Sequence, residues 1–163
     1  MATSERAGGT VSPGGNVSSG KRALSEDQQQ AMRRAVPDTM LATPYLSWLG
    51  LRFERYEPDD VLMRLGFRKE LTNVGTYYHG GVVAAVMDTA GAAAAWSNHD
   101  FNKGVRASTV GMSVQYVGAA KQSDLLCHGS VVRRGKELTF TEITATDSDG
   151  AVVAHGLQTY RIV

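Results

Sequence analysis

Apolar and polar side chains alternate over most of the second half of the chain, which is the pattern of half-buried β-strands. The connectors between the alternating stretches carry the Gly, Ser and Asp residues that are typical of hairpin loops. We therefore predict four strands, or fewer if some are continuous, within residues 105–118, 124–134, 137–147 and 151–163.

A shorter alternating region precedes them, in residues 51–67. Within it, Val61, Met63, Leu65 and Phe67 would lie on one face of an extended chain. The sequence EPDD interrupts the alternation with residues that favour a turn. We predict two further strands here, joined by that turn.

Two short helices are expected before the strands. Ser25 and Gln28 have the spacing of a capping box, so a first helix should cover residues 25–35 and end before Pro37. The apolar sequence YLSWLG at 45–50 predicts a second helix, closed by a glycine that suits a helix C-cap.

One long helix is predicted at residues 80–97, which are rich in alanine and contain no proline. Strands that follow one another as hairpins imply an antiparallel sheet, and the single long helix needs a large apolar face to lie on. Gly91 and the neighbouring alanines would let the helix backbone approach the sheet closely. The sequence thus predicts an α+β fold in which an antiparallel sheet wraps around a central helix.

Composition fits one domain with a polar tail. Of 163 residues 42% are hydrophobic, enough for a core, but residues 1–22 are mostly Gly, Ser, Thr and Ala and are predicted to be a disordered tail before a single domain at 23–163. The net charge of +1 argues against bulk binding to nucleic acid or to anionic membranes. A single cysteine, with no secretory or membrane-spanning run, favours a cytoplasmic protein.

Asp88 is the strongest candidate for chemistry, because it is the only charged residue between Val82 and Trp96. An unpaired carboxylate in an apolar environment costs several kcal/mol, so something must compensate for it. One interpretation is that Asp88 caps a neighbouring loop or pairs with an arginine. The other is that it activates water or attacks a substrate from a cleft of low dielectric.

The start of the long helix offers a second candidate. His79, Gly80 and Gly81 place main-chain N–H groups without side-chain cover at the positive end of the helix, where an anion or a developing oxyanion is stabilised. The two glycines can also be explained by the conformation of a turn. Eight residues separate Gly80 from Asp88, so the two lie about 12 Å apart along one helix. If both are catalytic, a shared site must combine the helix start of one subunit with the aspartate of another.

The spaced motif Asn73-x5-His79-Gly80-Gly81-x6-Asp88 resembles the signature of the hotdog-fold acyl-CoA thioesterases of the phenylacetate-pathway PaaI type. The resemblance extends from about Tyr45 to Val163, and it implies a hotdog fold. It also implies a homodimer with shared active sites, and a homotetramer of two such dimers. Neither a metal nor another cofactor is implied.

The resemblance also implies roles for single residues. Gly80 would donate its N–H to the thioester oxygen, Asn73 would hold the substrate or a water, and Asp88 would be the nucleophile or the general base. A Ser or Thr on the following strand would assist with water, which points to Thr109, with Ser108 as the neighbouring alternative. The motif's histidine, His79, would orient the site.

Binding residues are expected around these positions. The candidates are Gly81 at the helix start, Ser108, Tyr78 in an acyl pocket, and Arg106, Arg133 and Arg134 on the coenzyme A phosphates. For the sequence RRGK at 133–136, a solvated hairpin turn is the favoured interpretation. The remaining histidines show no metal-ligand spacing, and Cys127 alternates with apolar residues as a core side chain does.

The predicted function is hydrolysis of an acyl-CoA or a similar pantetheine thioester to a free acid and a thiol. A thioester has a good leaving group, so a strong general acid is unnecessary. One alternative is a hydratase or dehydratase of an acyl thioester, which usually places Asp and His together. Another is a non-catalytic regulator that binds acyl-CoA.

Overall fold

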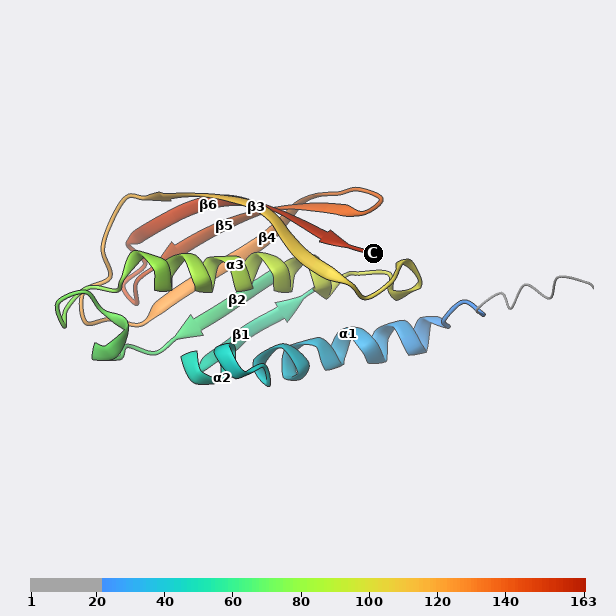
Figure 1. Ribbon diagram of the computed structural model, residues 1–163, viewed down its shortest axis with the longest axis horizontal. Helices are drawn as coiled ribbons and strands as arrows, with labels where there is room; N and C mark the ends of the chain where they lie inside the picture. Colours follow the sequence, from blue (N-terminus) through green and yellow to red (C-terminus); the bar gives the residue numbers. More distant parts are fainter. Residues whose placement is uncertain (1–21) are drawn as a thin grey trace, which may run out of the picture.

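The computed structural model describes residues 22–163 (Figure 1). Of the expected tail, residues 1–22, all but Arg22 lie outside this part of the chain. The described residues form three α-helices, α1 (Glu26–Leu41), α2 (Pro44–Leu49) and α3 (Gly80–Ser97), and two short 3₁₀ helices, η1 (Lys69–Leu71) and η2 (Phe101–Lys103). The six strands are β1 (Leu51–Glu57), β2 (Asp60–Leu65), β3 (Ala107–Tyr116), β4 (Leu125–Arg134), β5 (Leu138–Thr146) and β6 (Val152–Ile162).

All six strands form one antiparallel sheet in the order β1-β2-β4-β5-β6-β3. Figure 1 shows α3 lying along one face of this sheet, with α1 beside the edge strand β1. The predicted α+β architecture, a long helix against an antiparallel sheet, is confirmed. β1 and β3 are the two edge strands, and β3 is exposed along most of its length.

Strand β2 shows why the alternating pattern was informative. Val61, Met63 and Leu65 are fully buried, while the residues between them are half-buried. The turn before β2 is present, with Asp59 at a φ of 64°. Among residues 22–163, no helix combines the length and the hydropathy that crossing a membrane requires.

The first helix is longer than predicted, because α1 continues through Pro37 to Leu41. Proline removes one main-chain hydrogen bond from a helix, a cost that tertiary contacts can offset. Here Met40 and Leu41 pack against the core, and the Thr39 hydroxyl donates to the Ala35 carbonyl at 2.8 Å. The predicted capping box is confirmed at the start of the helix. The second helix is also confirmed, closed by Gly50 in the left-handed conformation.

Close packing of α3 on the sheet depends on a glycine in β4. A Cβ at Gly129 would lie 2.6 Å from the Ala90 carbonyl oxygen, so the backbones of strand and helix touch there. The Gly91 main-chain nitrogen would lie 3.2 Å from the same Cβ, so the close approach predicted at Gly91 and its alanine neighbours is confirmed. A Cβ at Gly91 would also meet side chains of the sheet, colliding with the Gln158 amide and lying 2.8 Å from the Thr141 hydroxyl. Gly91 therefore makes room for a buried side chain as well.

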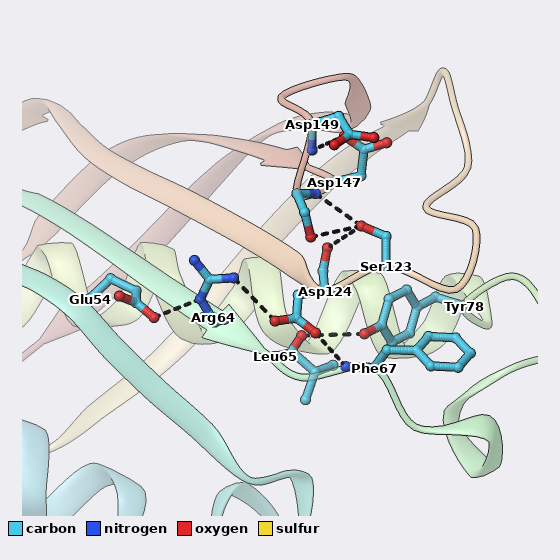
Figure 2. A network of polar contacts seen from close by, with 10 residues as sticks. Glu54, Arg64, Leu65, Phe67, Tyr78, Ser123, Asp124, Asp147 and Asp149 are labelled. Carbon is cyan, nitrogen blue, oxygen red and sulfur yellow. Dashed lines mark hydrogen bonds and ion pairs between the residues drawn. The ribbon is translucent and has the colours of Figure 1, made fainter.

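Asp124 joins β2 to the start of β4 (Figure 2). Its carboxylate accepts from the Phe67 N–H at 2.8 Å and from the Arg64 guanidinium at 3.1 Å, and Arg64 also donates to Glu54 at 2.6 Å. The Phe67 N–H, and after it Arg64, hold the pKa of Asp124 below its ordinary value. The network ties the end of β2 to the chain that leads into β4.

Replacing Asp124 with asparagine is expected to destabilise the protein at neutral pH and to have little effect in acid. A carboxyl group whose pKa is lower in the folded state contributes stability above its unfolded pKa of about 4, and that stability is lost as the pH falls through the folded pKa. Urea unfolding of both proteins between pH 2.5 and 7 measures this difference. Asp149→Asn, in an exposed loop, is the matched control. A loss of stability that is equal at all pH values would contradict a stabilising role for the ionised Asp124 carboxylate.

Candidate active site

Asp88 lies in the third turn of α3, half-buried, facing β3 and β6. One carboxylate oxygen, Oδ1, accepts from the Thr109 hydroxyl at 2.7 Å and from the Gln158 amide at 2.6 Å. The same amide donates to the Asp88 main-chain carbonyl at 3.0 Å. These contacts fix the carboxylate without neutralising its charge.

The second oxygen, Oδ2, has no hydrogen-bond partner within residues 22–163. Of the two interpretations of Asp88, pairing with an arginine or capping a loop is not what the structure shows. A carboxylate that is held through one oxygen and keeps the other free of hydrogen bonds has the arrangement of a general base or a nucleophile.

Gln158 on β6 is the residue that positions Asp88, and the sequence reasoning missed it. Its side chain is 2% exposed, and its amide oxygen accepts from the Thr141 hydroxyl at 3.3 Å. The space that Gly91 leaves open accommodates it. A signal was present, because alternation through β6 puts a glutamine on the face that otherwise carries Gly156, Tyr160 and Ile162.

Thr109, and not Ser108, is the strand residue that contacts Asp88. The register of β3 against β6 shifts just after it, from Thr109 opposite Tyr160 to Gly111 opposite Thr159, which leaves Val110 as an extra residue. Such bulges re-aim side chains and are frequent beside active sites. Ser108 remains exposed, one residue further from the carboxylate along the strand.

At the start of α3, the N–H groups of Gly80 and Gly81 differ in whether they have a hydrogen-bond acceptor. His79 is the N-cap residue, and its Nδ1 accepts from the Gly81 N–H at 2.9 Å. The Gly81 donor is therefore occupied, and a neutral His79 carries its proton on Nε2. For the Gly80 N–H, no acceptor is found in the described part of the chain. The Gly80 N–H is thus the group that could donate a hydrogen bond to a ligand.

Tyr116 is a second residue that the sequence did not point to. Its hydroxyl donates to the Gly80 carbonyl at 3.0 Å, and a Cβ placed on Gly80 would be 3.6 Å from its ring. It comes from the end of β3, while Thr109 on the same strand contacts Asp88. β3 therefore runs beside α3 and touches both candidate groups.

Gly80 and Asp88 belong to one uninterrupted helix. Eight residues of helical rise put them about 12 Å apart, too far to act on one carbonyl. Within one chain the structure brings Asp88 and Thr109 together, but it does not bring Gly80 to them. Asn73 is exposed in the loop before the helix, where its main-chain N–H donates to the Tyr77 carbonyl at 3.1 Å.

Two predicted binding residues have structural roles. Tyr78 is 6% exposed, packs against Phe67 and donates to the Leu65 carbonyl at 3.3 Å, so it belongs to the core and not to an acyl pocket. Arg134 donates to the Ala95 carbonyl at the end of α3, at 2.8 Å, and pairs with Asp59. Both are therefore left out of the site.

Arg106 and Arg133 have exposed side chains at the start of β3 and near the end of β4. The main-chain N–H of Arg106 donates to the Val163 carbonyl, and the Val163 N–H donates to the Arg106 carbonyl, both at 2.8 Å. Their assignment to coenzyme A phosphates stays a prediction.

A cleft of about 300 Å³ opens beside Asp88 and Thr109. Its other walls are largely apolar and include Met40, Leu46 and Tyr160, which come from α1, α2 and β6. A carboxylate at the side of an apolar cleft suits a ligand with both a polar group and a long apolar part.

Comparison with known proteins agrees with this geometry. The family model described as "Thioesterase superfamily" matches residues 75–154, which include Gly80, Asp88 and Thr109. A predicted esterase of Halobacterium salinarum is 30% identical over 126 residues, covering 72% of this chain and 83% of that protein. The chain belongs to the thioesterase superfamily. It is a thioester hydrolase, as the motif at residues 73–88 led us to expect.

Two further likenesses bear on this thioesterase. Acyl-coenzyme A thioesterase 13 of Pongo abelii is 28% identical over 104 residues, covering 63% of this chain and 72% of that protein. The solved structure of the E. coli PaaI protein, from the phenylacetic acid degradation operon, matches with a TM-score of 0.72 over 83% of this chain and 96% of that one. At 16% identity the second likeness shows the fold alone, and it confirms the predicted hotdog architecture.

Proposed function

We propose that this thioesterase, of the PaaI type, hydrolyses the thioester of an acyl-coenzyme A, or of a similar pantetheine conjugate, to a free acid and a thiol. The observation that carries the proposal is the Asp88 carboxylate, held through Oδ1 by Thr109 and Gln158 with Oδ2 open beside an apolar cleft. The similarity to an acyl-coenzyme A thioesterase supports the choice of thiol.

Asp88 acts in one of two ways. As a general base, Oδ2 takes a proton from water while the water oxygen attacks the thioester carbonyl. As a nucleophile, Oδ2 attacks the carbonyl itself, and water then hydrolyses the resulting anhydride. In both cases the carbon–sulfur bond breaks and the sulfur leaves with the electron pair. A thiolate is stable enough to leave without a strong general acid.

The developing oxyanion is stabilised by the Gly80 N–H of a second subunit, whose Asn73 holds the substrate or a water. Two observations support this division: the Gly80 N–H has no acceptor in residues 22–163, and Gly80 is about 12 Å from Asp88 of its own chain. Preorganised donors of this kind contribute about 100- to 1000-fold to kcat. Each dimer would hold two sites, each built from both subunits.

Edge strand β3 supplies the surface for the dimer. It is ten residues long, carries no charged side chain and is exposed, which makes it a template for pairing with a second copy. Val132, Phe140 and Leu157 are exposed on the outer side of the sheet, where two dimers would meet as a tetramer.

Hydrolysis is favoured over hydration or dehydration because His79 is engaged elsewhere. Its Nδ1 accepts from the Gly81 N–H at 2.9 Å as the cap of α3, so this nitrogen is not available as a base. We also propose that the protein acts in the cytoplasm, since the sequence has one cysteine, and Cys127 is a buried free thiol.

Release of free thiol from a panel of acyl-CoAs tests this function. We expect turnover with at least one straight-chain or aromatic acyl-CoA, measured with a disulfide reagent at matched enzyme concentration. Burial raises the pKa of the Cys127 thiol, so the folded enzyme itself should not react with the reagent. Binding of acyl-CoA without any thiol release would favour the non-catalytic regulator instead.

A further inference from the structure

Two cavities adjoin on the helix side of the molecule, and Met40 lies in the wall of both. One is the cleft beside Asp88. The other, of about 410 Å³, is bounded by α1 and by the chain around the end of α3, through Met32, Val36 and Trp96 among others. Its lining includes no charged side chain, and its volume is that of a small-molecule pocket.

Helix α3 connects the two cavities. Asp88, Ala92 and Trp96 follow one another at intervals of four residues, so they lie on the same side of the helix. Ala92 lines the cleft beside Asp88, and Trp96 lines the second cavity. Ala92 has a small side chain, and Met40, which lines both cavities, has a flexible thioether side chain that can adapt to a bound ligand.

Trp96 forms a fixed end to this path. Its indole N–H donates to the Tyr160 hydroxyl at 3.3 Å, and its ring stacks on Phe101 at 5.7 Å between centroids. Helix α1 is held opposite, because the Gln29 side chain bonds both Asp100, at 2.8 Å, and the Phe101 N–H, at 2.8 Å. The wall of the second cavity around Trp96 is therefore held in place by contacts of both α3 and α1.

Resting on the proposed hydrolysis of acyl-CoA, we infer that the acyl chain of the substrate runs from Asp88 over Ala92 and under Met40 to Trp96. The helix rises about 12 Å over these two turns. An extended chain advances about 1.2 Å per bond, so the path holds about ten bonds. The substrate is an unbranched acyl group of about ten to twelve carbons. An aromatic acyl group bound at Asp88 would leave the second cavity unfilled.

Filling the second cavity tests the inference. Val36 is half-buried on α1 and lines only that cavity, so Val36→Trp should block it and leave Asp88 untouched. Met32→Trp fills the same cavity from another position on the helix. Arg34→Trp adds the same ring to the exposed side of α1 and is the matched control.

Chain-length profiles of kcat/KM, from acetyl-CoA to palmitoyl-CoA, give the readout. In the wild type each buried methylene should raise kcat/KM by about fourfold, up to ten to twelve carbons. Val36→Trp and Met32→Trp should lower decanoyl-CoA turnover by about 100-fold or more, and Arg34→Trp should not. Butanoyl-CoA turnover should change less than about twofold in all three. Equal effects on both substrates, or no effect on either, would overturn the inference.

A binding measurement separates this inference from the proposed function. Decanoate, the product of the predicted reaction, should raise the thermal unfolding midpoint of the wild type and of Arg34→Trp, but not that of Val36→Trp. If decanoate binds in this pattern but no acyl-CoA releases thiol, the acyl groove stands and the proposed hydrolysis fails. If thiol is released but decanoate stabilises all variants equally, the groove is wrong and the hydrolysis stands.

Discussion

Asp88→Asn is expected to lower kcat for acyl-CoA hydrolysis by about 100- to 10,000-fold, the contribution of a positioned general base or nucleophile. Asparagine removes the charge and the basic Oδ2, which is the atom left open beside the cleft. KM should change much less, because the acyl chain and the thiol are bound elsewhere. Steady-state thiol release measures both constants.

The same substitution is expected to leave the fold intact. An asparagine Oδ1 still accepts from Thr109 and Gln158, so no buried donor loses its partner. The thermal unfolding midpoint should therefore stay within a few degrees of the wild type. Gln158→Glu is a useful comparison, because it places a second carboxylate against Asp88 and should lower both stability and turnover. Unaltered turnover in Asp88→Asn would remove Asp88 from the mechanism.

Much of the fold was predictable because the signals are local. The four C-terminal strands have the alternation of half-buried chain, and the length of α3 follows from alanine content and the absence of proline. The end of α1 could not be predicted in this way. Whether a helix continues through Pro37 depends on what Met40 and Leu41 contact, and those contacts come from the rest of the fold.

The residues of the candidate site show the same difference between local signals and contacts that depend on the whole fold. Asp88 was detectable as the single charge in an apolar helix, whereas Thr109 was implied only by the family resemblance, with Ser108 as the alternative. Gln158 was not proposed, because its role depends on the β5 and β6 register and on the space at Gly91. The contacts of Arg134 were not predictable for a related reason: a basic residue near a hairpin looks solvated until the end of α3 is placed beside it.

Gly80→Pro is expected to lower kcat/KM by about 100- to 1000-fold while the helix still forms. Proline has no N–H, so the substitution deletes the donor itself. Gly80 is the first residue of α3, a position that proline favours, and His79 before it has φ −63° and ψ 135°, the conformation proline requires of its predecessor. Gly80→Ala keeps the N–H, and its Cβ would lie 3.6 Å from Tyr116, an ordinary contact. It should retain most activity. Equal losses in the two variants would mean that crowding at Gly80 matters, and not the N–H.

Combining the two substitutions in one dimer tests the shared site. In a heterodimer of an Asp88→Asn chain and a Gly80→Pro chain, one site would receive both changes and the other neither. If each site takes Gly80 from one subunit and Asp88 from the other, purified heterodimers should recover about half of the wild-type activity per dimer. If both groups came from one chain, every site would carry one defect and the heterodimer would be as inactive as its parents. Because about 12 Å of helix separates the two groups within a chain, recovery is the expected result.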